Sequence, residues 1–273
     1  MAEDPLGRGA TARLLAAHGV RPRKDLGQHF LVDPNLVRRI VAVAGVGPGD
    51  RVLEIGAGAG TLTRGLAAAG ARVRAYEVDP RLRPVLDEAL RGAPGVEVRY
   101  EDAADLDPAS LGEGPWVVVA NLPYHVGTPL LLRLLRRAPA IRRFVVMLQR
   151  EAVERLAAGP GSRVYGLPSV TVRLHGTVEV AFRVSPNVFL PAPKVESAVA
   201  VIRRTPARPL TEEAIALAAV AFGQRRKMLR RSLAGALAAP AAVLGAADID
   251  PARRAEDLAP EDYLRLAEVA HAG

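Results

Sequence analysis

The chain has 273 residues, 49% of them hydrophobic and 24% charged, which is typical of a globular protein with a sizeable core. It contains no cysteine, which excludes disulfides, thiolate zinc sites and cysteine nucleophiles and fits a protein of the reducing cytoplasm. Its formal net charge of +8 favours an anionic partner such as nucleic acid, because neutralising phosphates releases their counterions.

Residues 1–25 are predicted to form an N-terminal arm that begins with a short helix and ends in a basic run. Glu3, Asp4 and the shortness of the apolar patch that follows argue against a secretory signal. Residues 34–46 then place apolar side chains at helical spacing, which predicts a helix with Asp33 as its N-cap.

Strands and helices alternate in the middle of the chain. The predicted strands are 51–55, 72–78, 96–100, 116–120 and 144–148, and the predicted helices between and after them are 62–69, 81–90, 128–137 and 151–158. Such alternation predicts right-handed βαβ units and a parallel sheet with helices on both faces. Two more strands, 178–184 and 197–202, are joined by the proline-rich link 186–193. They predict a terminal hairpin, so the expected sheet has seven strands with the last one antiparallel.

Beyond residue 204 the pattern is purely helical. The helices predicted there are 212–222, 225–239 and 260–270. Pro206 and Pro209 mark the join, so we expect a first domain over 1–205 and a small all-helical domain over 206–273. The uncharged stretch 232–247 is rich in Ala and Gly and is interrupted by Pro240, so it is not expected to span a membrane.

A glycine-rich loop follows the first strand of the alternating region. It includes Gly56 and Gly58, and glycines allow a sharp turn and close approach to a ligand. The dinucleotide fingerprint requires Gly or Ala five residues after its first Gly, whereas Thr61 stands there. An acidic residue, Glu54, precedes Gly56 by two positions, a pattern similar to class I methyltransferases with their Rossmann-like fold. A nicotinamide oxidoreductase is therefore disfavoured.

Two carboxylates follow the next strands. Glu77 ends the second strand, 21 residues after Gly56, where a carboxylate can accept hydrogen bonds from a ribose diol. Asp79 precedes a proline and is better read as the N-cap of the next helix. Asp102 ends the third strand and is placed to accept a bond from an adenine amino group, with a solvated loop carboxylate as the alternative reading.

The most specific motif is Asn121-Leu122-Pro123-Tyr124, which directly follows the apolar strand 116–120. The exocyclic amine of adenine is a poor nucleophile, because its lone pair is delocalised into the ring. An Asn oxygen and a backbone carbonyl fixed by the following proline can accept both amine hydrogens and aim the lone pair at a sulfonium methyl group. Tyr124 offers a face on which an extruded base can stack. Orientation and desolvation then suffice, with no metal and no general base.

At these motifs the chain resembles the ribosomal RNA adenine dimethyltransferases, most closely their bacterial small-subunit (16S) group. The segments that carry the resemblance are 26–31, 54–60, Glu77, Asp102, 121–129, 189–197 and 222–227. His29 replaces the Asn that is more usual in the family, and His125 after the motif is a second departure to which we assign no role.

The resemblance implies S-adenosylmethionine as the cofactor and the domain 1–205 as its binding and catalytic domain. The cofactor-binding residues would then be Gln28, His29, Leu31, Gly56, Gly58, Glu77, Asp102 and Asn121. The catalytic residues would be Asn121, Leu122, Pro123, Tyr124 and Phe189. Phe189 would close on the second face of the target base, although packing in the core is the alternative for an aromatic side chain.

A cationic run in the last domain suggests how RNA is held. It consists of Arg225, Arg226, Lys227, Arg230 and Arg231. With Leu229 and Leu233 on an apolar stripe, helical spacing would separate a buried side from a cationic one. A charge run is often only a solvated surface, but beside a base-methylating site it indicates phosphate binding, so 206–273 is the expected RNA-docking domain.

The resemblance implies dimethylation of two adjacent adenines in a hairpin near the 3′ end of 16S rRNA, within the immature small ribosomal subunit in the cytoplasm. A monomer suffices for this activity. The alternatives are a 23S rRNA adenine methyltransferase of the macrolide-resistance type, a DNA amino-methyltransferase, and an assembly checkpoint factor for which methylation is secondary. Leu122 and the segment 224–227 favour the small-subunit enzyme.

Overall fold

A computed structural model describes residues 5–124 and 126–272, so Glu3, Asp4 and His125 lie outside the described residues. The chain divides into two compact units. Unit 1 comprises residues 1–153 and 179–203, and unit 2 comprises 154–178 and 204–273. None of the described helices is long and apolar enough to cross a membrane.

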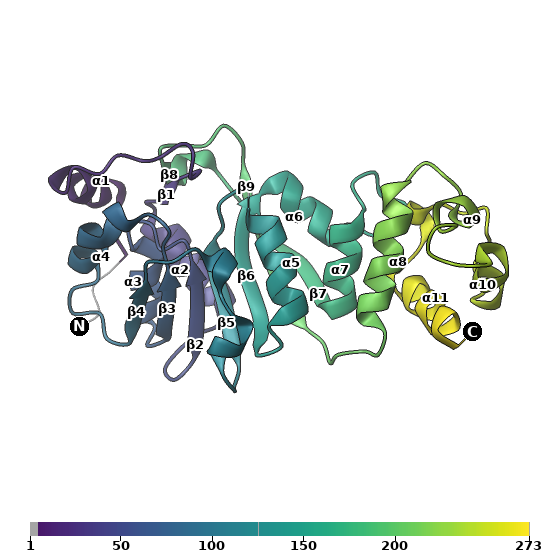
Figure 1. Cartoon of the computed structure of the whole chain (residues 1–273). Coiled ribbons are helices and arrows are strands. Elements are labelled where there is room, and N and C mark those ends of the chain that lie inside the picture. The colour runs from purple at the N-terminus through teal and green to yellow at the C-terminus, as the bar shows by residue number, and fades with distance from the viewer. Residues whose placement is uncertain (1–4, 125, 273) are drawn as a thin grey trace. The chain divides into compact units, whose positions relative to one another are not determined.

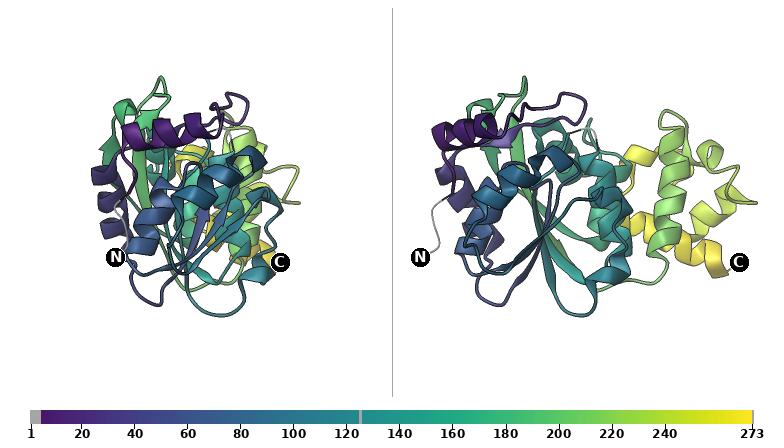
Figure 2. Two further views of the ribbon diagram at one scale, coloured as in Figure 1. Left: turned by 90° about the vertical axis from the view of Figure 1, so that its left-hand side faces the viewer. Right: turned by 60° about the vertical axis from the view of Figure 1, so that its left-hand side comes forward.

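Unit 1 is built on a seven-stranded sheet with the strand order β4-β3-β2-β5-β6-β9-β7 (Figures 1 and 2). The strands are β2 (Arg51–Ile55), β3 (Arg72–Tyr76), β4 (Val96–Arg99), β5 (Trp116–Asn121), β6 (Ile141–Gln149), β7 (Gly176–Val184) and β9 (Ser197–Arg204). The pairs from β4 across to β6 are parallel, and β9 runs antiparallel to β6. The predicted mostly parallel sheet with an antiparallel last strand is confirmed.

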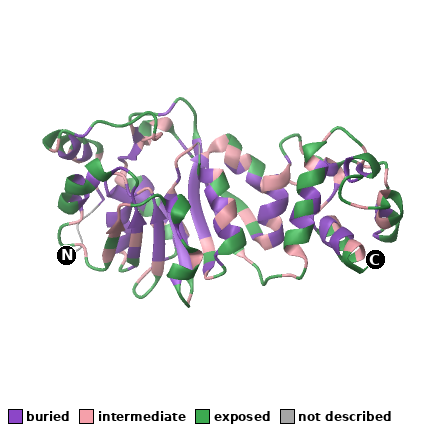
Figure 3. Cartoon of the chain, in the orientation of Figure 1, coloured by how far each residue is buried: buried purple, intermediate pink, exposed green. Residues whose placement is uncertain are grey.

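Helices cover both faces of this sheet (Figure 2). They are α2 (Pro34–Ala44), α3 (Thr61–Ala68), α4 (Arg83–Ala89), α5 (Gly127–Arg137) and the start of α6 (Arg150–Ala157). The helix α1 (Arg8–Ala17) packs next to α4. Short 3₁₀ turns are η1 (Pro80–Leu82), η2 (Ala103–Asp105), η3 (Pro108–Leu111) and η4 (Pro186–Val188). Because both faces are covered, strands such as β2 and β5 are almost wholly buried (Figure 3). Asp33 accepts hydrogen bonds from the amides of Asn35 and Leu36, so the predicted N-cap of α2 is confirmed.

A second, two-stranded sheet was not predicted. Strand β1 (Phe30–Leu31) pairs antiparallel with β8 (Phe189–Leu190), with Phe30 opposite Leu190. Strands of two residues are too short for an alternation pattern to reveal. The N-terminal arm is tied to the same link, because the Arg8 guanidinium donates a hydrogen bond to the Phe189 carbonyl at 3.0 Å.

Apart from the strand residues at its borders, the regular structure described in unit 2 is helical. It contains α7 (Leu167–His175), α8 (Thr211–Gly223), α9 (Leu229–Ser232), α10 (Pro240–Ala246), the 3₁₀ turn η5 (Ala255–Asp257) and α11 (Pro260–Ala272). The expected division at 205/206 lies close to the structural one at 203/204, but residues 154–178 also belong to this unit. They do so because Val170 and Leu174 of α7 are buried in one core with Ile215 and Ala218 of α8.

The predicted helix 225–239 is wrong. Only the short α9 forms there, with turns before and after it. The amides of Leu229 and Arg230 donate to the carbonyls of Arg253 and Pro251, so tertiary hydrogen bonds replace those that would continue a helix backward. The helix α10 was missed because Pro240 was read as an interruption, whereas proline is favoured in a helix's first turn.

Candidate active site

Two cavities lie at the carboxyl ends of β2, β3 and β5. The strand order turns at β2, whose neighbours are β3 and β5, and such a switch point is where open α/β sheets bind ligands. One cavity is about 70 Å³ and the other about 400 Å³. They share four lining residues: Leu26, Gly56, Val78 and Pro123. The shared residues make the two cavities parts of one candidate site.

The glycine-rich loop forms the floor of this site. Gly56 and Gly58 both have positive φ, 81° and 56°, which favours glycine at each position. A Cβ on Gly58 would lie 3.1 Å from the Phe30 ring, and one on Gly56 would lie 3.6 Å from the Asn121 carbonyl oxygen. The missing Cβ at Gly58 leaves room for the Phe30 ring, and the backbone of both glycines lines the smaller cavity.

Glu77 presents an oriented carboxylate to the smaller cavity. Its Oε2 accepts from the Gly58 amide at 2.8 Å and its Oε1 accepts from the Asp79 amide at 2.9 Å. Burial raises the pKa of Glu77, and these two backbone hydrogen bonds oppose the rise. A carboxylate has about four lone-pair positions, so both oxygens can still accept from a diol. This is the chemistry that the sequence assigned to Glu77.

Asp79 is a structural residue, as predicted. It accepts from the Arg81 amide at the start of η1 and pairs with the Arg81 guanidinium, which with Gln28 holds the pKa of Asp79 down at about 2. The Gln28 amide donates to Asp79 at 2.9 Å and accepts from the Arg23 amide at 2.8 Å. Both ends of the Gln28 side chain are therefore engaged within the protein, and it acts by holding the segment that carries Leu26 over the site.

Asp102 lines the larger cavity together with apolar side chains such as Ile55 and Leu130. Its Oδ1 accepts from the Ala104 amide at 2.8 Å, which orients the carboxylate as the cap of η2. Arg133 of α5 donates to the Leu106 carbonyl at 2.8 Å and also bonds the Ala104 carbonyl. It thus ties the loop after Asp102 to the opposite wall. Sequence reasoning missed Arg133, because nothing in its spacing marks it.

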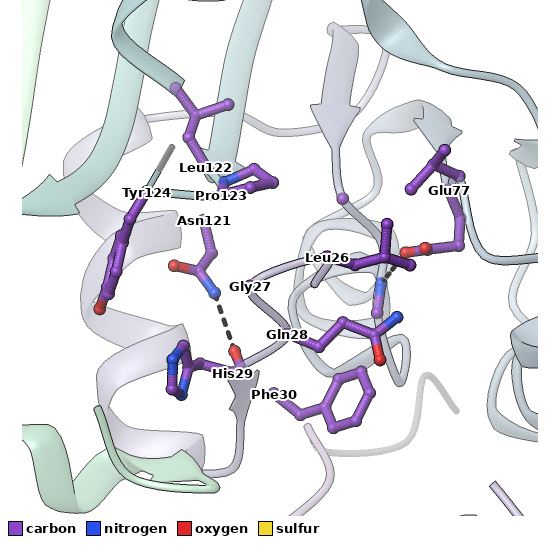
Figure 4. A pocket seen from close by; sticks show the side chains of 13 residues that line it. Leu26, Gly27, Gln28, His29, Phe30, Glu77, Asn121, Leu122, Pro123 and Tyr124 are labelled. Carbon is purple, nitrogen blue, oxygen red and sulfur yellow. Dashed lines mark hydrogen bonds between the residues drawn. The ribbon is translucent and has the colours of Figure 1, made fainter. Parts of the chain in front are cut away.

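The Asn121 amide has one defined orientation. Its Nδ2 donates to the His29 carbonyl at 3.2 Å, so its Oδ1 is left to accept (Figure 4). The Pro123 carbonyl accepts from the Gly127 amide at 2.8 Å, whereas within the described residues no backbone amide donates to the Leu122 carbonyl. The site therefore offers two neighbouring acceptors, the Asn121 Oδ1 and the Leu122 carbonyl.

Tyr124 is held at both ends. Its hydroxyl shares a hydrogen bond of 2.7 Å with the Ser197 Oγ, and its ring stacks on the His29 ring with centroids 5.7 Å apart (Figure 4). Burial raises the pKa of Tyr124, so the hydroxyl stays neutral. The His29 Nδ1 bonds the Pro191 carbonyl at 2.8 Å. The imidazole thus faces Tyr124 and Pro191, and the His29 backbone orients Asn121.

Two predicted site residues are not brought to the cavities. Phe189 is fully buried and packs in the core of unit 1, and Leu31 is 5% exposed in the same core. Neither lines the two cavities. The alternative reading of Phe189 as a core residue is therefore the correct description of its surroundings, since pairing of β8 with β1 turns its side chain inward.

The predicted cationic run lies in unit 2 and is not all on one helix. Arg226, Lys227, Arg230 and Arg231 are exposed. Arg225 is half-buried, forms an ion pair with Glu256 and donates to the Arg163 carbonyl at 3.1 Å. Its charge is therefore already compensated, and four of the five residues remain as the candidate RNA-contacting surface.

Within the described residues, no group of three or more His, Cys, Asp or Glu side chains could hold a metal ion. The donor set fits an adenosine-bearing cofactor: a buried carboxylate, Glu77, beside a glycine-rich loop, and a largely apolar slot whose lining includes the carboxylates of Glu101 and Asp102.

Comparisons with known proteins agree with this geometry. The family model described as ribosomal RNA adenine dimethylase matches residues 19–272. The ribosomal RNA small subunit methyltransferase A of Leifsonia xyli subsp. xyli is 47% identical over 261 residues, which cover 91% of this chain and 92% of that protein. The structure of the 23S rRNA methyltransferase ErmE is similar with a TM-score of 0.69 and 30% identity, over 89% of this chain and 99% of that one. The structure of a dimethyladenosine transferase from Plasmodium falciparum is similar with a TM-score of 0.76 and 25% identity, over 87% of this chain and 96% of that one.

The acidic residue before the glycine-rich loop gives a prediction about stability. Complete burial raises the pKa of Glu54 from an ordinary 4.5 to about 8, with the nearby Glu77 adding to the rise and Thr63 opposing it. Between these pH values the folded protein keeps a proton that the unfolded chain releases, so stability falls as pH rises. Relative to Glu54→Gln, the wild-type free energy of unfolding should fall by up to about 1.4 kcal/mol per pH unit and level off above pH ~8.

Denaturant unfolding of both proteins between pH 5 and 9 measures this difference. Glu113→Gln, which changes an exposed carboxyl in a loop, should follow the wild-type curve throughout. Parallel curves for wild type and Glu54→Gln would show that Glu54 is ionised in the folded protein at neutral pH.

Proposed function

The chain belongs to the ribosomal RNA adenine dimethylase family, and we propose that it dimethylates two adjacent adenines in a hairpin near the 3′ end of 16S rRNA. It is an S-adenosylmethionine-dependent rRNA adenine dimethyltransferase. The choice of the small-subunit rRNA is supported by identity: the small-subunit methyltransferase of Leifsonia is 47% identical, whereas the 23S rRNA enzyme ErmE is 30% identical. We place the reaction in the cytoplasm, on immature small subunits, and expect a monomer.

The observation that carries this proposal is the orientation of Asn121. Its amide nitrogen donates to the His29 carbonyl, so its oxygen, together with the Leu122 carbonyl, would be available to accept from the amine of an extruded adenine. Accepting both amine hydrogens draws the nitrogen away from conjugation with the ring and exposes its lone pair. Leu122 is kept in place because its own amide donates to the Met147 carbonyl at 3.1 Å and its side chain is buried.

S-adenosylmethionine supplies an electrophilic methyl group on a positively charged sulfur. Glu77 would hold its ribose and Asp102 its adenine amine, with Gly56 and Gly58 passing beneath it. Leu26, which lines both cavities, would cover it and exclude water. The protein thus contributes position and a dry site, which can lower a barrier by several kcal/mol without proton transfer by a side chain.

Tyr124 would stack on the target base. Its hydroxyl is tethered to Ser197, so the ring is oriented before RNA arrives and little rotational freedom is lost on stacking. The exposed cations of unit 2, Arg226, Lys227, Arg230 and Arg231, would bind phosphates of the rRNA.

The substrate assignment has a direct test. Purified protein and methyl-labelled S-adenosylmethionine should label immature small subunits that lack the modification, with label recovered as N6,N6-dimethyladenosine in 16S rRNA. Fully modified small subunits serve as the control and should take up no label. Label found only in 23S rRNA, or only in DNA, would contradict the assignment of 16S rRNA as the substrate.

Replacing Asn121 by Ala should separate chemistry from cofactor binding. The rate of methyl transfer at saturating substrates should fall by about 10²–10³-fold, the usual cost of removing a positioned polar group at a reacting centre. The dissociation constant for S-adenosylmethionine, measured by calorimetry, should change by less than about threefold, since other residues hold the cofactor. Asn35→Ala, an exposed Asn in α2, is the matched control and should keep full activity. Simultaneous loss of binding and transfer would make Asn121 a structural residue.

The cationic surface of unit 2 predicts a salt effect. Changing both Arg226 and Arg230 to Ala should weaken binding to immature subunits and reduce the slope of log K against log salt concentration by about two, roughly one for each phosphate that is no longer bound. Arg265→Ala is the control, because Arg265 is already paired with Asp262 at 2.6 Å. An unchanged slope in the double variant would show that these cations are only solvated and do not bind phosphates of the rRNA.

A further inference from the structure

A third cavity in unit 1 is not used by the chemistry described above. It has a volume of about 190 Å³ and lies where β6 ends and α6 begins. Its lining residues are Gln149, Arg150, Glu151, Val195 and Glu196.

This cavity lies beside the reacting centre. Gln149 is the ladder partner of Ser197 across the β6–β9 pair, and Ser197 is the residue that holds the Tyr124 hydroxyl at 2.7 Å. The other neighbour of β6 is β5, and there Asn121 of β5 is the ladder partner of Met147 of β6. Asn121 and Ser197, which serve the proposed base-binding site, are therefore the ladder partners of two residues that lie two positions apart on β6, and the second of these, Gln149, lines the third cavity. A nucleotide next to the target base would lie within reach of the cavity.

The charges of the lining residues do not suit a phosphate. Arg150 is paired with Glu196 at 2.9 Å, and Glu151 adds a second, exposed carboxylate. Two carboxylates against one guanidinium would repel an anion and attract a hydrogen-bond donor. An exocyclic amine of a nucleic-acid base is such a donor.

Gln149 supplies the side chain that can recognise a base. Within the described residues its side-chain amide has no hydrogen-bond partner, so both its carbonyl and its NH₂ can bind a ligand. A Gln amide pairs with adenine bidentately, accepting from the exocyclic amine and donating to an adjacent ring nitrogen. Val195 is 46% exposed and offers an apolar contact, and the planar guanidinium of Arg150 can lie against a base. Guanine would turn a carbonyl oxygen towards the carboxylates in place of the amine.

We propose that this cavity is a second base subsite, which holds the neighbouring adenine while the first is methylated. Gln149 is its specificity-determining residue. The inference rests on the proposed function, since it needs two adjacent adenines in the substrate. The protein would then recognise the base next to the target directly, in addition to recognising the shape of the RNA.

The test uses immature small subunits in which one of the two adjacent adenines, each in turn, is replaced by guanine. The rate of methylation of the remaining adenine is compared with its rate in the natural pair. For the wild-type protein, we expect about a tenfold loss on replacement, equivalent to about 1.4 kcal/mol. In Gln149→Ala the same replacement should cost less than about twofold. Because each ratio is taken within one protein, a partly unfolded variant does not distort it.

Arg142→Ala is the matched control. Arg142 is exposed near the opposite end of β6, and this variant should keep the tenfold ratio. A tenfold ratio that persists in Gln149→Ala, or a wild-type protein that does not distinguish adenine from guanine, would overturn the subsite. Absence of methylation on the natural pair by the wild type would instead refute the proposed function, so the two failures are distinguishable.

Discussion

The hydrogen bond from the Asn121 Nδ2 to the His29 carbonyl is the constraint on which the site depends. An amide that could rotate would present a donor to the substrate amine as often as an acceptor, and a donor would repel the amine hydrogens. His29 directly precedes the β1–β8 ladder, in which Phe30 lies opposite Leu190 and Leu31 opposite Phe189, so this pairing helps to place the His29 carbonyl. In the proposed site, a two-residue ladder outside the central sheet thus sets which atom of Asn121 would meet the base.

Most of the fold and the cofactor side of the site could be predicted, because both follow from strand ends. In a parallel sheet the carboxyl ends of neighbouring strands meet at one edge, so Gly56, Glu77 and Asn121, each at the end of its strand, had to come together once the strands were identified. The roles proposed for them rest on local chemistry. Asp79 could be separated from Glu77 because a following proline marks a cap.

The parts that could not be predicted depend on tertiary contacts. Phe189 is turned into the core by a strand pairing of two residues, and no sequence period reports such a pairing. Residues 225–228 have helical spacing but lack a helix, because the amides of Leu229 and Arg230 donate to a loop later in the chain. Arg133 lines the larger cavity without belonging to any motif. In each case contacts with residues distant in the sequence determine the local structure, so local propensity predicts it wrongly or does not predict it at all.

Some polar groups of the site have a hydrogen-bond partner within the protein and others do not, and this difference indicates where a ligand can bind. Gln28, Asp79, the Tyr124 hydroxyl and His29 Nδ1 all have protein partners, so they are fixed before any ligand binds. Within the described residues, the acceptors left open beside them include the Asn121 Oδ1 and the Leu122 carbonyl. A site that must lower a barrier by orientation alone needs this division, because every mobile polar group would have to be ordered at the moment of reaction. The rigid framework therefore serves the two open acceptors, and the chemistry follows from their direction.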